Sequence, residues 1–199
     1  MDKRLKGHTD MNTPDFFDQL DDCPVIASVK DAEGLETALK SKSRVIFTLY
    51  GDVLNISQIT RRIKDAGKLP FVHIDLVEGL SARDISADYI ASYTSAEGII
   101  STKSNLIGRA SELGLLSIQR CFLLDSLALS NIVRQSAKSS ACAIEVLPGP
   151  MPKVLSRITG TVSMPVIAGG LISDKEDVMH ILGAGARAVS STNPEIWFL

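Results

Sequence analysis

The chain has 199 residues, of which 45% are hydrophobic and 22% are charged, and its formal net charge at pH 7 is −2. This length and composition suit a globular protein with a large core, and the small negative charge excludes a protein that is polycationic overall. No run approaches the ~20 apolar residues that span a bilayer, and the first residues lack the apolar segment of a signal peptide, so we expect a cytoplasmic protein without a membrane partner.

A polar leader, residues 1–22, precedes the regular part of the chain. Residues 1–12 have no apolar periodicity and are expected to be disordered. The segment Thr13-Pro-Asp-Phe-Phe-Asp-Gln-Leu20 has helix-start residues and an apolar face, which predicts a short helix. We assign residues 23–199 to one barrel domain.

Short β-branched runs then alternate with amphipathic segments at a spacing of roughly 25 residues, which is typical of βαβ units on a parallel sheet. The predicted strands are residues 24–29, 44–50, 69–75, 98–102, 116–122, 143–147, 165–168 and 188–191. Eight is the number that a closed barrel needs, and continuous apolar runs such as Val45-Ile-Phe47 indicate strands that are covered on both faces. The sequence therefore predicts an α/β fold, a compact (β/α)8 TIM-type barrel with short loops, because ~250 residues is more usual.

The predicted helices have readable ends, with Asp31 as the N-cap of one helix and Asp174 or Ser173 as the N-cap of another. Residues 193–199 are too short for an ordinary eighth helix, so the C-terminal helix is expected to be shortened or incomplete. We expect the leader helix to cover the place that the eighth helix leaves open.

Small residues follow the last two predicted strands, in Pro165-Val-Ile-Ala-Gly-Gly170 and Ala188-Val-Ser-Ser-Thr-Asn193. These are the strand ends at which a (β/α)8 barrel commonly binds phosphate, because glycine lets an oxyanion approach backbone N–H groups and hydroxyls add donors. The predicted phosphate ligands are Gly169, Gly170, Ser190, Ser191 and Thr192.

Other polar residues stand at the C-terminal ends of the predicted strands, where such barrels carry their function. Those that we expect around a ligand at the barrel mouth are Lys30, His73, Asp75, Lys103, Arg120 and Glu145. The period-two spacing of His73 and Asp75 places them on one face, where they either recognise a polyol or perform acid–base chemistry, or form a pair that orders the next loop. A metal site is poorly supported because only three histidines exist and none has ligand spacing.

Glu145 lies inside an apolar strand, where an unpaired carboxylate is costly to bury. Arg120, one strand earlier, is its nearest basic partner by topology, and the pair is either structural or a ligand contact. Lys30 and Lys103 either neutralise an anion or, in an aldolase, form a Schiff base.

Residues 40–68 hold seven basic and two acidic residues, a formal charge of +5. Arg61, Lys64 and Lys68 are expected to fall on one helical stripe, and the candidate RNA-binding residues are Arg61, Arg62, Lys64 and Lys68. The alternative interpretation is a solvated helix face.

The three cysteines, Cys23, Cys121 and Cys142, are odd in number and widely spaced. This pattern argues against disulfides and zinc, so we expect reduced packing residues.

Several of these motifs occur in one linked order. They are Pro24-Val-Ile-Ala-Ser-Val-Lys-Asp31, Val72-His-Ile-Asp-Leu-Val-Glu-Gly-Leu80, Glu97-Gly-Ile-Ile-Ser-Thr-Lys103, Ile118-Gln-Arg-Cys-Phe-Leu-Leu-Asp-Ser126, Ile144-Glu-Val-Leu-Pro-Gly149, Pro165-Val-Ile-Ala-Gly-Gly-Leu-Ile172, and Ser190-Ser-Thr-Asn193 before Trp197. In this order the chain resembles the glycerol uptake operon antiterminator regulatory family, the glycerol-3-phosphate-responsive transcription antiterminators of bacteria.

The resemblance implies a non-catalytic barrel that takes glycerol-3-phosphate as its effector, needs no cofactor, and acts on the leader mRNA of glycerol-utilisation genes. Two other interpretations stay open. One is a phosphosugar lyase or isomerase that uses Lys30, Lys103 or Asp75, and the other is a barrel that serves only as a scaffold in a homo-oligomer.

Overall fold

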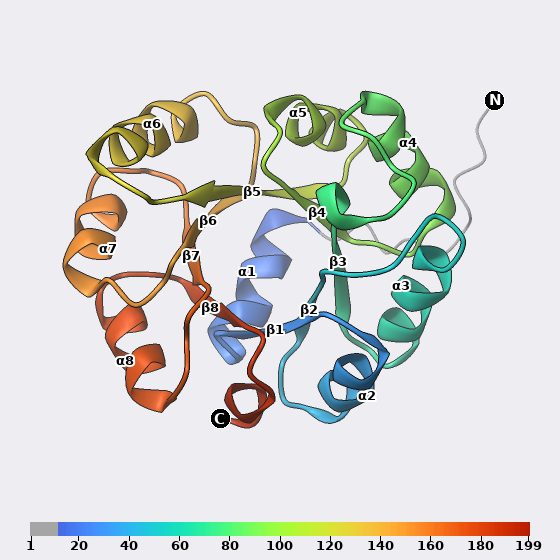
Figure 1. Ribbon diagram of the computed structural model, residues 1–199, viewed down its shortest axis with the longest axis horizontal. Helices are drawn as coiled ribbons and strands as arrows, with labels where there is room; N and C mark the ends of the chain where they lie inside the picture. Colours follow the sequence, from blue (N-terminus) through green and yellow to red (C-terminus); the bar gives the residue numbers. More distant parts are fainter. Residues whose placement is uncertain (1–11) are drawn as a thin grey trace.

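The computed structural model describes residues 12–199, in which parallel strands close into a barrel in the order β1 to β8 (Figure 1). The strands are β1 Val25–Val29, β2 Val45–Thr48, β3 Leu69–His73, β4 Gly98–Ser101, β5 Leu116–Phe122, β6 Ala143–Leu147, β7 Val166–Gly169 and β8 Ala188–Ser191. The predicted (β/α)8 barrel is therefore confirmed. Three strands have the predicted bounds, and the others differ by one or two residues at an end.

The barrel is accompanied by helices, and all of them but the first cover its outside (Figure 1). They are α1 Thr13–Asp22, α2 Ala32–Lys40, α3 Ile56–Asp65, α4 Asp84–Tyr93, α5 Ser104–Glu112, α6 Ser126–Ser136, α7 Pro152–Thr159 and α8 Lys175–Gly183, with the 3-10 helices η1 Ile74–Leu76 and η2 Pro194–Phe198. Asp31 accepts a hydrogen bond from the Gly34 N–H (2.7 Å) and Asp174 accepts one from the Asp177 N–H (2.9 Å), so both predicted N-caps are present.

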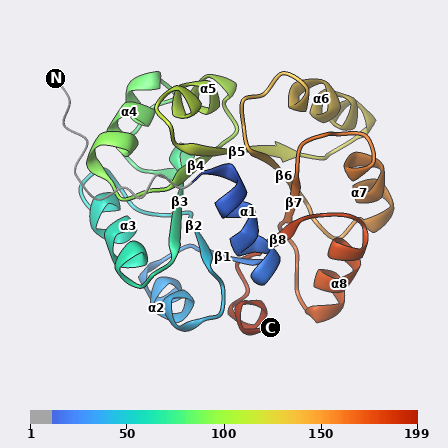
Figure 2. The same cartoon turned by 180° about the vertical axis from the view of Figure 1, so that it is seen from behind.

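The leader helix α1 exists, but our expectation of its position was wrong. Figure 2 shows α1 across the end of the barrel rather than among the outer helices. Phe16 and Leu20 are fully buried with the residues of the barrel interior, and the ring of Phe16 lies 5.0 Å from that of Phe71. Their apolar side chains close the N-terminal end of the barrel, and burial of this apolar surface stabilises the helix there. Of the segment expected to be disordered, only Asn12 is among the described residues, and it caps α1.

The place of an eighth outer helix is filled in part by η2. Trp197 is buried there and its Nε1 donates to the Ser191 carbonyl oxygen at 2.7 Å. The short C-terminal helix is as predicted, and it packs against β1, β8 and α2.

The alternation of side chains along each strand determines which polar residues point into the barrel at its mouth. Phe71 and Ile118 belong to the interior cluster. Because side chains two residues apart share a face, His73 and Arg120 point into the barrel above them. Glu145 follows the interior residue Ala143 in the same way.

Candidate functional site

A cavity of about 250 Å³ opens at the C-terminal ends of the strands, and we call it the mouth cavity. It is lined by Ser28, Leu49, Arg120, Glu145, Leu147, Gly170, Leu171, Ile172, Ser190, Ser191 and Thr192. The cavity thus brings together most of the predicted phosphate ligands with two of the six residues predicted around the ligand.

Arg120, Glu145 and Ser190 form one buried polar network beneath this cavity. The Arg120 Nε donates to Glu145 Oε2 at 2.6 Å, and the Ser190 hydroxyl donates to Glu145 Oε1 at 2.6 Å. The Glu145 side chain is fully buried and that of Arg120 is 9% exposed. The partner that topology favoured for Glu145 is the one it has. Because both carboxylate oxygens are bonded, the buried charge is compensated.

The hydrogen bond between Ser190 and Glu145 leaves no room for a side chain at Gly169. A Cβ atom at this position would lie 2.3 Å from the Ser190 Oγ and 2.9 Å from Glu145 Oε1. Gly169 is not among the residues that line the mouth cavity, and its predicted contact with phosphate stays a prediction. Gly169 leaves the space through which Glu145 reaches Ser190.

The loop after β7 presents its backbone to the cavity. Gly170 and Leu171 are consecutive residues with positive φ, +74° and +58°, and Leu171 is 80% exposed. Among residues 12–199, the N–H groups of Gly170, Leu171 and Thr192 have no hydrogen-bond acceptor. Backbone N–H groups without an acceptor in the protein are available to an anion, and a non-glycine residue with positive φ marks a place where strain is retained.

Two side-chain contacts tie this loop to the end of β8. The Ser191 hydroxyl donates to the Ile172 carbonyl oxygen at 3.2 Å, and Asn193 Nδ2 donates to the Ser173 carbonyl oxygen at 2.9 Å. The donors around the mouth cavity are therefore held in place before any ligand binds.

His73 and Asp75 are close in space but do not share a strand. Strand β3 ends at His73, and Asp75 lies in η1, where it accepts hydrogen bonds from the Ser101 hydroxyl (2.5 Å) and from the N–H and hydroxyl of Thr102 (both 2.8 Å). Asp75 thus fastens η1 to the end of β4, which favours the loop-ordering interpretation for this residue. The His73 side chain is buried, and its Nδ1 has no partner among the described residues.

These surroundings shift both pKa values downward. Burial lowers the pKa of His73 to about 4. The positive charge of Arg120 also lowers this pKa, whereas the negative charge of Asp75 raises it. Burial alone would raise the pKa of Asp75, but the hydrogen bonds from Ser101 and Thr102 outweigh it and lower the pKa. At neutral pH His73 is therefore neutral and can accept a hydrogen bond.

The remaining predicted mouth residues lie outside the cavity. Lys30 and Lys103 are exposed and neither lines it. In the described part of the chain, no three His, Cys, Asp or Glu side chains are grouped to hold a metal ion. Likewise, none of the helices described has the length and apolar character to cross a membrane. The cysteines are free, and burial raises the pKa of Cys121 and of Cys142 to about 11.

The predicted RNA-binding stripe on α3 is occupied by contacts within the protein. Arg61 pairs with Asp65 at 3.1 Å, Arg62 with Glu36, and Lys64 with Glu97. Lys68 Nζ donates to the carbonyl oxygens of Ser41 and Ser43, at 2.8 and 2.7 Å. Three of the four cations thus already face a carboxylate.

Known proteins resemble this chain over most of its length. The sequence model of a family described as glycerol-3-phosphate responsive antiterminator matches residues 25–197. The protein YgcP of Escherichia coli (strain K12) is 44% identical over 176 residues, which are 88% of this chain and 92% of that protein.

Two solved structures are also similar. The glycerol uptake operon antiterminator regulatory protein of Listeria monocytogenes str. 4b F2365 has a TM-score of 0.84 and 32% identity, over 88% of this chain and 95% of that one. A glycerol uptake operon antiterminator-related protein of Thermotoga maritima MSB8 has a TM-score of 0.77 and 30% identity, over 87% and 96%.

Proposed function

The chain belongs to the glycerol-3-phosphate responsive antiterminator family, and from this premise we propose that it binds glycerol-3-phosphate in the mouth cavity and regulates antitermination on the leader RNA of glycerol-utilisation genes. The observation that carries the ligand proposal is the set of free donors around one small cavity. Gly170, Leu171 and Thr192, whose backbone N–H groups have no acceptor among the described residues, line this cavity together with Arg120.

The phosphate group is assigned to these donors. Arg120 uses its Nε to bond Glu145, while its two Nη groups have no acceptor within residues 12–199. A guanidinium held on one edge presents the other edge to two oxygens of a phosphate, and such charge-assisted bonds are among the stronger hydrogen bonds. Ser190, Ser191 and Thr192 complete the wall on the β8 side.

The glycerol hydroxyls are assigned to the opposite side of the cavity. Each oxygen of Glu145 accepts one hydrogen bond from the protein and has a further lone pair for a hydroxyl donor. His73 lies close enough to Arg120 for their charges to interact, and its neutral Nδ1 lacks a partner among the described residues. Although His73 does not line the mouth cavity, we propose that this nitrogen accepts a hydrogen bond from a ligand hydroxyl.

We assign the cavity a binding role without turnover. A Schiff-base lyase needs a lysine that reaches the bound carbonyl, and neither Lys30 nor Lys103 lines the cavity. Regulation then requires that the ligand favour one state of the protein, and the tied loops after β7 and β8 are the elements that contact it. Such a regulator acts where transcription occurs, which agrees with a cytoplasmic location.

Calorimetric titration tests this proposal, with glycerol and inorganic phosphate as matched comparisons. We expect glycerol-3-phosphate to bind more tightly than either fragment and to be recovered unchanged. Anisotropy of a labelled leader transcript, with and without glycerol-3-phosphate, tests the RNA part. Absence of ligand binding, or consumption of the phosphate ester, would contradict the proposal.

A further inference from the structure

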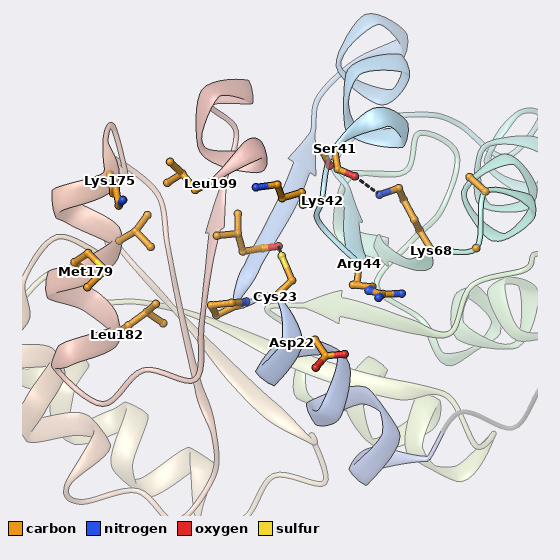
Figure 3. Close-up of a pocket in the computed structure, with 15 residues that line it drawn as sticks. Asp22, Cys23, Ser41, Lys42, Arg44, Lys68, Lys175, Met179, Leu182 and Leu199 are labelled. Carbon is orange, nitrogen blue, oxygen red and sulfur yellow. Dashed lines mark hydrogen bonds between the residues drawn. The ribbon is translucent and has the colours of Figure 1, made fainter.

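A second and larger hollow, of about 750 Å³, lies on the side of the barrel between α8 and the start of β1 (Figure 3), and we call it the side groove. Its lining comes from α8, from the turns that follow α1, α2 and α3, and from the last residue of the chain. The residues are Asp22, Cys23, Pro24, Val25, Ser41, Lys42, Arg44, Ala66, Gly67, Lys68, Lys175, Val178, Met179, Leu182 and Leu199.

The groove exists because the outer ring of helices is incomplete. Lys175, Val178, Met179 and Leu182 have the spacing of one helix face, the face of α8 that borders the place of an eighth outer helix. The short η2 covers only part of that place, so the face stays open and Met179 is 60% exposed.

The charges in the groove are unbalanced. Lys42, Arg44 and Lys175 are exposed, and within residues 12–199 none of them forms an ion pair or a side-chain hydrogen bond. Lys68 is held by two carbonyl oxygens, which satisfy its hydrogen bonds but leave its charge uncompensated. Asp22 is the one carboxylate side chain among the lining residues. Arg61, Arg62 and Lys64 on α3 have the opposite character, because each of them already faces a carboxylate. Lys68, the fourth residue predicted to bind RNA, lies after α3 and lines the side groove.

We propose that the side groove, and not the α3 face with Arg61, Arg62 and Lys64, holds a single-stranded segment of the leader RNA. This inference rests on the proposed function in taking RNA as the partner, and it adds the surface that contacts it. Unpaired, exposed cations release counterions when phosphates bind, whereas paired ones must first lose a carboxylate.

The two walls of the groove match the two sides of a single strand. Figure 3 shows Lys42, Arg44 and Lys68 opposite Met179 and Leu182, with Lys175 at the upper end of the α8 wall. A single strand presents phosphates on one side and apolar base faces on the other. A duplex would offer phosphates alone and leave the apolar wall uncovered.

The test compares two variants with the same change of charge. The groove variant is Lys42→Gln, Arg44→Gln and Lys175→Gln together. The control variant is Lys138→Gln, Lys153→Gln and Arg157→Gln, which removes three exposed cations on and near α6 and α7, away from the groove. The binding of a fluorescent leader transcript is measured by anisotropy at several salt concentrations, and thermal melting checks that both variants are folded.

We expect the groove variant to bind RNA at least ~10-fold more weakly than the control and to lose about 2 from the slope of log affinity against log salt, since three single-strand contacts contribute about 0.7 each. Equal loss in both variants would show a bulk charge effect and overturn the groove assignment. Unchanged binding by the groove variant, with the parent protein still binding RNA, would overturn the assignment alone and leave the proposed function in place. No RNA binding by the parent protein would overturn both.

Discussion

The mouth cavity and the side groove both present cations, but only the mouth cavity holds its cation in a fixed position. Arg120 is bonded to a fully buried Glu145, and the loops around it are tied to each other. Lys42, Arg44 and Lys175 are exposed side chains that no described carboxylate orients. A preorganised site suits one small anion of defined shape, whereas long solvated cations suit a polymer whose phosphates need only be near. Net charge alone therefore does not identify a binding surface, because a cation must also be free of an ion pair to contact a phosphate.

Removal of the Glu145 carboxylate is the most severe way to break the mouth network. Glu145→Leu leaves Arg120 buried without its counter-ion, and we expect it to cost about 3–5 kcal/mol of unfolding free energy. Glu145→Gln keeps a carbonyl acceptor and should cost less. Denaturant unfolding measures both.

The double variant Glu145→Leu with Arg120→Met is the control for this prediction. It removes both charges, so most of the lost stability should return. If the single and double variants are equally unstable, the loss comes from packing and not from the unpaired charge.

A change at Gly170 tests the anion site without disturbing the ion pair. Gly170→Asp places a carboxylate beside the proposed phosphate site. Repulsion between the two negative charges should reduce glycerol-3-phosphate affinity by at least ~100-fold. The control is Gly170→Asn, which has nearly the same shape and tolerates the positive φ of +74° better than most residues. Calorimetry on both folded variants measures the difference, and equal affinities would move the phosphate away from this loop.

The pH dependence of stability reports the burial of His73. In the unfolded chain this histidine takes up a proton near pH 6.5, but in the folded protein only near pH 4. Between these values the unfolded chain binds more protons, so stability falls as the pH falls from about 6.5 to about 4, by roughly 3 kcal/mol.

His73→Gln should flatten this part of the stability curve, whereas His180→Gln, at an exposed histidine on α8, should not. Denaturant midpoints at several pH values measure it. Parallel curves for the parent protein and His73→Gln would show that His73 is not the group that titrates.

The sequence was sufficient for features that depend on neighbours in the chain or on adjacent strands. Apolar runs predicted the barrel, and Arg120 lies beside Glu145 in the register of β5 and β6, so topology alone indicated their pairing. Contacts between segments that lie far apart in the chain could not be predicted from the sequence. The ion pairs of Arg62 and Lys64 use Glu36 and Glu97, far away in the sequence.

The sequence also did not predict the backbone geometry of the loop after β7. The Gly169-Gly170 pair signalled a special loop, but the space that Gly169 leaves for Glu145 and the positive φ of Leu171 require coordinates. The position of α1 depended on how much apolar surface the open end of the barrel exposes, which a one-dimensional pattern does not measure.

The smallest expected effect concerns whether the two regions communicate. Trp197 is the single tryptophan of the chain and is buried between them: its Nε1 donates to the carbonyl oxygen of Ser191 at the mouth cavity, and Leu199 of the side groove follows two residues later. If glycerol-3-phosphate shifts the loop after β8, the emission of Trp197 should change slightly and saturate at the calorimetric midpoint. Gly170→Asp should abolish this change. Because coupling between two binding sites is reciprocal, bound RNA should then alter glycerol-3-phosphate affinity by the same factor as the ligand alters RNA affinity. Unchanged emission and equal ligand affinities with and without RNA would show that the mouth cavity and the side groove act independently.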